Sequence, residues 1–211
     1  MTKYNLVYFP VRGRGEAIRI LLVDNDQDYE ETNCAPFDKF LAEWKPKMAF
    51  GQVPALYDGD FMLVQSNAIL RYLARKHDLY GSNNRTAAKI DELNDGVEDL
   101  RGAYVKLIYT NYENGKAEYI EKLPNNLKPF EKLLSDSKAS DTGAAVGGKM
   151  SFVDYNLFDL LENHQILSPG CLDAFPTLKS WHAKMAARPK IAAYHQTEGF
   201  KSRAINGNGK Q

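Results

Sequence analysis

Two polar residues stand at positions where an α/β protein can bind a ligand. Tyr8 ends the segment Tyr4–Phe9, which predicts a strand stopped by Pro10, and the C-terminal edge of a sheet is where α/β folds hold ligands. Ser66 opens a segment with helical periodicity through Leu73, and the free N–H groups at a helix start attract an anion. Together these residues predict a site for an anionic, peptide-like ligand. The alternative is a half-buried packing tyrosine and an N-cap serine.

The stretch Phe50–Ile69 has to position that anion site. Its apolar segments Ala55–Tyr57 and Phe61–Val64 predict two strands, and Asp58-Gly59-Asp60 between them predicts a hairpin turn. Val53-Pro54 places a proline at the mouth of the first strand, where the ring removes a ladder donor. This X–Pro bond is a candidate cis bond, although most such bonds are trans. An ordinary hairpin before an N-cap serine is the competing explanation.

The composition limits the classes of function. The 211 residues allow one large or two small domains, and the 27 basic residues balance 27 acidic ones, so nucleic acid and membrane surfaces are not expected as partners. Cys34 and Cys171 are too few for a disulfide framework and are not spaced as a metal site. The first residues lack the apolar region of a signal peptide, and no apolar run approaches ~20 residues. We expect a cytoplasmic protein without a metal.

The first eighty residues predict a small α/β domain. A helix from Glu16 and a strand over Asp28–Thr32 follow the first strand, and the irregular segment Cys34–Met48 precedes the hairpin. The resulting order, β-α-β and then β-β-α, is that of a thioredoxin-like fold. Arg12-Gly13-Arg14-Gly15 lacks the third glycine of a dinucleotide motif. Pro10–Gly15 contains no cysteine, which argues against thiol–disulfide exchange by a protein dithiol.

The remaining residues, 81–211, predict an all-α domain. The turn-rich segment His77–Asn84 is the candidate linker. Apolar residues spaced by three and four over Ile90–Ile108 predict one long helix whose acidic residues face solvent. A second helix is predicted over Lys116–Leu134, disturbed by two prolines. Ser151 with Asp154 predicts a capping box that starts a central apolar helix.

Several segments resemble the cytosolic glutathione transferases, and some resemble their pi class in particular. The motifs run in the same order along the whole chain: Y-F-P-V-R-G-R-G from Tyr8, F-G-Q-V-P from Phe50, Q-S-N-A-I-L-R from Gln65, N-D-G-V-E-D-L-R from Asn94, L-I-Y-T-N-Y-E from Leu107, S-F-V-D-Y-N-L from Ser151, C-L-D-A-F-P from Cys171 and I-N-G-N-G-K-Q from Ile205. The resemblance implies a thioredoxin-like glutathione-binding domain over residues 1–80 and an all-helical domain over 81–211 that contributes the electrophile pocket, in a homodimer.

The resemblance also implies a role for individual residues. Tyr8 would be the catalytic residue, because its hydroxyl would hydrogen-bond the glutathione sulfur. Asp99 would reach the ligand across the dimer interface. The other residues that would contact glutathione are Arg14, Trp44, Lys45, Gln52, Val53, Pro54, Gln65 and Ser66. The electrophile pocket would be lined by Phe9, Val11, Val105 and Tyr109, and Phe50 would insert between helices of the partner subunit.

Some positions depart from the family pattern. Pi-class proteins place a tryptophan several residues before the equivalent of Lys45, whereas here Lys39-Phe40-Leu41 occupies that region and Trp44 is the candidate replacement. Met48 stands where mammalian pi-class proteins have a reactive cysteine, so redox inactivation through that thiol is not expected. Gly15 and Glu16 also differ from the pattern.

The implied function is conjugation of reduced glutathione to hydrophobic electrophiles by thiolate attack, with glutathione as co-substrate and without a tightly bound cofactor. A non-catalytic protein that binds ligands or signalling partners on the same fold is the alternative. A glutathione-dependent isomerase or peroxidase is a third interpretation. Joint presence of Tyr8, Gln65, Ser66 and Asp99 favours the transferase.

Overall fold

The computed structural model describes residues 3–211, which form two compact units. The first unit contains the residues up to His77 together with Pro189–Gly207. The second contains Asp78–Arg188 and Asn208–Gln211. By packing, Pro189–Gly207 therefore goes with the first unit, whereas the predicted division at residues 80 and 81 assigns it to the second domain.

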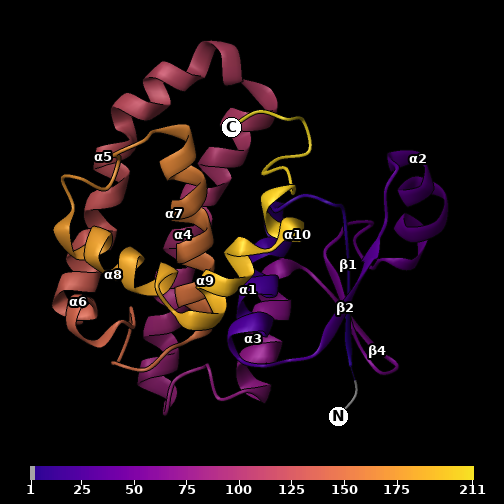
Figure 1. Ribbon diagram of the computed structural model, residues 1–211, viewed down its shortest axis with the longest axis horizontal. Helices are drawn as coiled ribbons and strands as arrows, with labels where there is room; N and C mark the ends of the chain where they lie inside the picture. The colour runs from indigo at the N-terminus through magenta and orange to yellow at the C-terminus, as the bar shows by residue number, and fades with distance from the viewer. Residues whose placement is uncertain (1–2) are drawn as a thin grey trace. The chain divides into compact units, whose positions relative to one another are not determined.

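A mixed four-stranded sheet forms the centre of the first unit, in the order β2-β1-β3-β4 (Figure 1). Its strands are β1 (Tyr4–Tyr8), β2 (Tyr29–Asn33), β3 (Ala55–Asp58) and β4 (Phe61–Val64). β1 pairs with β2 in parallel and with β3 antiparallel, and β3 pairs antiparallel with β4. All four strands were predicted, the second over Asp28–Thr32 where the structure has Tyr29–Asn33, and Gly59 has the positive φ that the predicted hairpin turn requires.

Helices α1 (Glu16–Asp24) and α3 (Ser66–Lys76) lie on one side of this sheet, and the α2 region lies on the other (Figure 1). Both helices bury their apolar residues, including Ile18 and Leu21 of α1 and Leu73 of α3. Helix α9 (Pro189–Gln196) packs on α1 and is followed by the short helix α10 (Glu198–Lys201). The fold class is thus a thioredoxin-like α/β unit with a helical second unit.

The segment predicted to be irregular contains three short helical turns. They are α2 (Phe37–Lys39), the π-turn η2 (Phe40–Trp44) and the 3-10 turn η3 (Lys45–Lys47), and another 3-10 turn, η1 (Gly13–Gly15), precedes α1. Each turn is too short to show helical periodicity, and Pro36 and Pro46 bound or interrupt them. For this reason the sequence pattern could not predict them.

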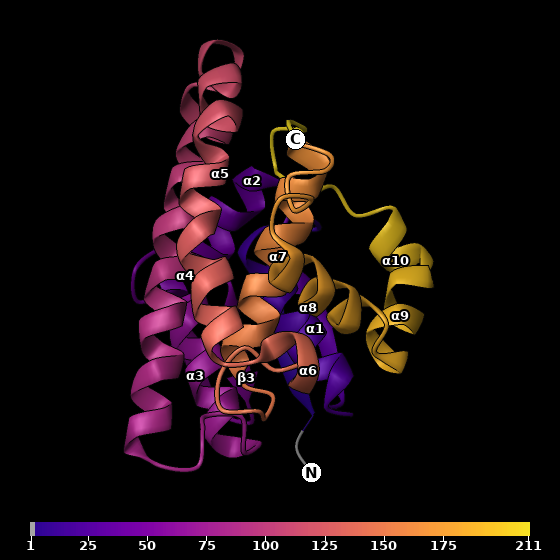
Figure 2. The same cartoon turned by 90° about the vertical axis from the view of Figure 1, so that its left-hand side faces the viewer.

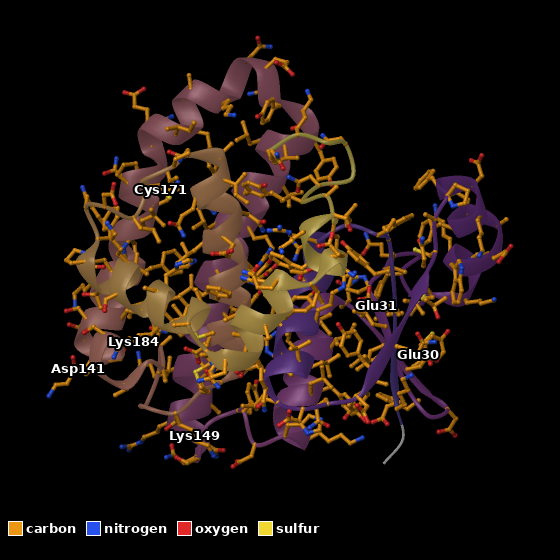
Figure 3. All side chains as sticks on the ribbon, viewed as in Figure 1. Glu30, Glu31, Asp141, Lys149, Cys171 and Lys184 are labelled. Carbon is orange, nitrogen blue, oxygen red and sulfur yellow. The ribbon has the colours of Figure 1, made fainter. Side chains whose placement is uncertain are left out.

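The second unit is a bundle in which α4 (Asn84–Thr110) and α5 (Tyr112–Asp136) run alongside each other (Figure 2). Helix α7 (Phe152–Leu167) packs on α4, while α6 (Ala139–Thr142) and α8 (Pro176–Ala186) pack on each other and on α5. Lys184 of α8 donates to the carbonyl oxygen of Asp141 at 3.0 Å, and both are labelled in Figure 3. Asn83 caps α4 by accepting from the backbone of Arg85 and Thr86, each at 3.0 Å.

Helix α5 begins at Tyr112, before the predicted start at Lys116, and continues through both of its prolines. The C-terminal residues stabilise this extra turn. The hydroxyl of Tyr112 donates to the carbonyl oxygen of Gln211, and Lys210 pairs with Glu113 at 2.8 Å. The tail showed no core-forming pattern, yet Ile205 is buried. Contacts distant in sequence thus decide both features.

The predicted capping box at the start of α7 is confirmed. The backbone N–H of Ser151 donates to Asp154 Oδ2 at 2.8 Å, and Ser151 Oγ donates to the same oxygen at 2.9 Å. The backbone N–H of Ala145 donates to Asp154 Oδ1 at 2.6 Å. Asp154 therefore joins the helix start to the preceding loop.

Helix α8 receives its cap from another helix. Pro176 occupies its first position, so the sequence offers no polar N-cap residue there. Instead, the carboxylate of Glu131 on α5 accepts from the backbone N–H groups of Thr177 and Leu178, at 3.0 and 2.8 Å. A carboxylate at a helix N-terminus also interacts favourably with the helix dipole.

We expect Ser151→Ala to lower the free energy of unfolding by about 1–2 kcal/mol, because the buried capping box loses its hydroxyl. Thermal unfolding followed by circular dichroism measures this. Ser135→Ala is the matched control, since Ser135 is exposed within α5, where alanine is a better helix former. Equal melting temperatures for wild type and Ser151→Ala would remove Ser151 as a cap.

Asp154 and His164, both buried in α7, make the free energy of unfolding depend on pH in opposite directions. Burial raises the pKa of Asp154 to about 6, so the contribution of Asp154 to the free energy of unfolding is full below its unfolded pKa and is lost as the pH rises through about 6. Burial lowers the pKa of His164 to about 4, so its contribution is full above its unfolded pKa and is lost as the pH falls through about 4. Between these values the two contributions offset each other.

We therefore expect His164→Gln to expose the contribution of Asp154. The variant loses the bond between His164 Nε2 and the Tyr119 hydroxyl, which costs stability at every pH. Its free energy of unfolding should nevertheless rise by about 2–3 kcal/mol from neutral pH to about pH 4, relative to the change in wild type. Urea titrations across this range measure the difference, and parallel pH profiles for both proteins would contradict it.

Candidate functional site

Tyr8 ends β1 beneath the loop that leads into α1. Its hydroxyl oxygen accepts a hydrogen bond from the backbone N–H of Arg14 at 2.9 Å. The loop passes so close that a Cβ on Gly13 would lie 2.6 Å from the hydroxyl oxygen, and one on Gly15 2.6 Å from the ring. Gly13 also has a φ of +43°. Gly15, which differs from the family pattern, thus leaves room for the phenol ring under the loop.

The proline at the mouth of β3 follows a cis peptide bond, as the resemblance implied for Val53–Pro54. Pro54 is buried, and the next residue, Ala55, pairs with Val7 of β1 and Val64 of β4. Val53 therefore enters the sheet at the end of β3 that adjoins the C-terminal end of β1, where Tyr8 lies.

Ser66 is the first residue of α3, and Gln65 occupies the N-cap position with a φ of 75°. The alternative interpretation of Ser66 as an N-cap serine is therefore wrong. The side chain of Gln65 donates to Gln52 Oε1 at 3.1 Å. Because Gln65 points to Gln52 rather than to the helix, it leaves the N-terminus of α3 open to an anion.

Lys45 lies along the backbone that leads to Gln52. A Cβ on Gly51 would lie 3.2 Å from the Lys45 side chain. Trp44 packs against the apolar cluster that includes Val7 and Met48. Its Nε1 is buried and has no hydrogen-bond partner within residues 3–211, so it is a donor still available to a carboxylate.

Further aromatic rings lie next to Tyr8. Phe9 packs edge-on to Tyr8 at 6.3 Å between ring centroids, and it contacts Phe37 at 6.4 Å and Phe40 at 5.3 Å. Sequence analysis did not select Phe37, although it is 61 % exposed. The spacing of Phe37 and Phe40, three residues apart, could have indicated that both rings lie on one face of a helical turn. These rings form an apolar wall beside the phenol.

The remaining predicted residues belong to other segments of the chain. Val11 is half-buried in the loop after β1, and Phe50 is 68 % exposed. Asp99, Val105 and Tyr109 all belong to α4 in the second unit. Asp99 is exposed, Tyr109 is 51 % exposed, and Val105 packs on the cluster that contains Tyr104. Their roles stay predictions.

The two cysteines are poor nucleophiles. Burial raises the pKa of Cys34 and of Cys171 to about 11 in each case, and both are free thiols. Within residues 3–211 no cluster of three or more His, Cys, Asp or Glu side chains could hold a metal ion. A nucleophilic sulfur at Tyr8 would therefore have to come from a ligand.

In the described part of the chain, no helix combines the length and apolar character needed to cross a membrane.

Known proteins match the whole chain. Residues 4–75 match the family model of the glutathione S-transferase N-terminal domain, and residues 98–198 match that of the C-terminal domain. The chain is 51 % identical to "Glutathione S-transferase P" of Capra hircus, over all of both chains. It is 50 % identical to "Glutathione S-transferase P 1" of Bufo bufo, over 99 % of each. The solved pi-class glutathione S-transferase of Onchocerca volvulus is 44 % identical with a TM-score of 0.93, over 99 % of this chain and 100 % of that one.

We expect Gly15→Ala to lower the free energy of unfolding by about 1–3 kcal/mol, because the added methyl group displaces the Tyr8 ring. Gly15 has an ordinary helical backbone conformation, so the cost comes from this contact. Gly199→Ala is the matched control, since its Cβ would meet nothing within 4 Å. Urea unfolding compares the two, and equal midpoints would mean that the Tyr8 ring moves aside without cost.

Proposed function

The chain belongs to the glutathione S-transferase family and to its pi class, and from this premise we propose that Tyr8 activates the thiol of glutathione. The enzyme conjugates reduced glutathione, its co-substrate, to hydrophobic electrophiles. The observation that supports the role of Tyr8 is the 2.9 Å hydrogen bond from Arg14 N–H to its hydroxyl oxygen. The bond that this oxygen accepts polarises the O–H group of Tyr8, which makes it a stronger hydrogen-bond donor to a thiolate.

The hydrogen bond from Tyr8 would favour the charged form of the sulfur. A free thiol has a pKa of ~8.5, so only about 3 % is thiolate at neutral pH. A downward shift of about 2 units would raise that fraction to roughly three quarters, for about 3 kcal/mol of differential stabilisation. The nucleophilicity of a thiolate falls as its basicity falls, and this loss of about tenfold in rate cancels most of the gain in thiolate fraction. Most of the acceleration would therefore come from holding thiolate and electrophile together.

The rest of glutathione would extend along the sheet edge. Its γ-glutamyl carboxylate would bind at the open N-terminus of α3, at Gln65 and Ser66, with Gln52 beside them. The backbone of Val53, before Pro54, would pair with the cysteinyl part. The glycyl carboxylate would bind Lys45, with the unpaired Nε1 of Trp44 as a second donor. Arg14 would lie close to the thiol.

The electrophile would lie against an apolar wall. Phe9 and the aromatic rings that contact it would supply one part of this wall, and Val11 would add to it. Val105 and Tyr109 would supply the other part from α4. An apolar pocket excludes water from the thiolate and strengthens its contacts.

We also propose a cytoplasmic homodimer. Phe50 is 68 % exposed, so its aromatic ring is accessible to a second copy of the chain. The second unit has a cavity of about 340 Å³ lined by residues of α4, α5 and the following loop, including Leu93, Leu133 and Val146. Phe50 of one copy would fill this cavity in the other, and Asp99 would then reach the other copy's glutathione. The two free cysteines suit a reducing compartment.

We expect Tyr8→Phe to lower kcat roughly ten- to hundredfold, the value of a hydrogen bond to a charged group, with little change in glutathione affinity. Conjugation of an aryl halide and calorimetric titration with glutathione measure the two quantities. Tyr72→Phe removes a hydroxyl that bonds Asp58 at 2.6 Å instead, and serves as the control. Equal losses of turnover and affinity would contradict thiol activation by Tyr8.

We expect Phe50→Glu to convert the protein to a monomer, because the carboxylate loses the apolar contacts of the ring and meets the like charges of Glu92 and Asp136, which also line the cavity. Sedimentation velocity at micromolar concentration measures the change. Phe37→Glu is the control, since Phe37 is 61 % exposed and comparable in size. A wild type that sediments as a monomer would exclude the proposed dimer.

A further inference from the structure

A partly buried network of charged and hydroxyl side chains lies beside the loop over Tyr8. We propose that Arg203, Tyr194 and Glu16 are positioning residues of the transferase reaction, which hold this loop so that the backbone N–H of Arg14 stays on the Tyr8 hydroxyl. The proposal rests on the proposed role of Tyr8 in activating glutathione.

The segment that follows Arg203 holds one edge of the loop through its backbone. The N–H of Arg12 donates to the carbonyl oxygen of Ala204 at 2.8 Å, and the N–H of Gly13 donates to that of Ile205 at 3.0 Å. Val11 and Ala204 form an isolated parallel bridge. The C-terminal segment thus fixes the backbone immediately before Arg14.

Arg19 of α1 binds the same loop through its carbonyl oxygens. Its Nη1 donates to Val11 at 2.9 Å and to Arg12 at 3.4 Å. Its guanidinium carbon lies 5.7 Å from the centroid of the Tyr8 ring. Arg19 is fully buried, so its position is fixed by its partners rather than by solvent. The loop is thereby bound by side-chain and backbone groups from two different segments.

Glu16 and Tyr194 join these two segments. Glu16 accepts from Arg19 Nη1 at 2.8 Å and, on its other oxygen, from the Tyr194 hydroxyl at 2.7 Å. The hydroxyl of Tyr194 in turn accepts from Arg203 Nη1 at 2.8 Å. The chain of contacts therefore runs from α1 through α9 to the residue that precedes Ala204.

Glu31 of β2, labelled in Figure 3 between the sheet and the C-terminal segment, closes the network into a ring. It accepts from Arg203 Nη2 at 3.0 Å on one oxygen and from Arg19 Nε at 3.0 Å on the other. Two guanidinium groups thus face two carboxylates, and the charges balance. Glu16 is 1 % exposed, so its charge depends on these partners for compensation.

The geometry explains why charged groups suit this place. Apolar residues of similar volume would stabilise a buried region equally well, but they would not fix the direction of carbonyl and N–H groups. A guanidinium has donors in a rigid fork, which fixes each acceptor in angle as well as distance. Displacement of a reacting group by about 1 Å can cost roughly a hundredfold in rate. The network therefore acts on the direction of the Arg14 N–H.

The test compares Tyr194→Phe and Arg203→Leu with wild type. Both should raise the pKa of enzyme-bound glutathione, read from its ultraviolet thiolate absorbance, by about one unit, so that kcat/KM at neutral pH falls roughly threefold or more. The KM for glutathione should stay within about twofold, because these residues do not contact the ligand. Tyr194→Phe removes one hydroxyl only and keeps the test open if Arg203→Leu fails to fold.

Lys190→Ala is the matched control. Lys190 also joins the C-terminal segment to the α1 region, since it pairs with Asp26 and donates to the carbonyl oxygen of Asp24, but it does so at the far end of α1. This variant should lose stability and keep the wild-type pKa of bound glutathione. An equal shift in Lys190→Ala would overturn the proposal, because general loosening would then explain the effect.

Tyr8→Phe separates the two proposals. If it raises the pKa of bound glutathione and folded Tyr194→Phe does not, the positioning role is wrong and thiol activation by Tyr8 stands. If Tyr8→Phe leaves that pKa at the wild-type value, thiol activation fails and the positioning role fails with it. A raised pKa in Tyr8→Phe, Tyr194→Phe and Arg203→Leu supports both.

Discussion

The hydrogen bond from the backbone of Arg14 to the Tyr8 hydroxyl is the contact on which the proposed activation of glutathione depends. A phenol at a strand end is ordinary, but a backbone donor held on its oxygen polarises the O–H group. That arrangement requires a loop close enough to touch the ring, hence glycine at positions 13 and 15. The glycines in turn make the loop easy to deform, because they lose more conformational freedom on ordering than other residues.

Both units bury a charged side chain that holds a segment of irregular backbone. In the first unit, Arg19 holds the flexible loop through its carbonyl oxygens. In the second, Asp154 holds the loop before α7 through the N–H groups of Ala145 and Ser151. An apolar side chain could fill either space, but it could not bind backbone groups of a segment without regular structure. Arg19 and Asp154 each stand where irregular backbone must be fixed.

Local patterns predicted most of the fold. The strands, the hairpin turn and the starts of α1 and α7 depend on neighbouring residues, and all were visible in the sequence. The early start of α5 depends on the last residues of the chain, so it was missed. Ser66 proved to be the first helical residue rather than the cap, because the left-handed backbone of Gln65 shifts the helix start. The network at Glu16 was invisible, since Tyr194 lies 178 residues away in the sequence.

The position of Cys34 shows why the nucleophile is supplied by the ligand. Its backbone N–H donates to the carbonyl oxygen of Tyr8 at 3.1 Å, so this thiol belongs to the same sheet edge as the phenol. On its side of the sheet, however, it is packed among Val7, Phe40 and other apolar residues, and burial raises its pKa to about 11. A thiol placed under the loop instead would meet the hydroxyl of Tyr8, which favours the thiolate. The same strand end thus keeps one sulfur protonated through burial and would ionise another through a hydrogen-bond donor.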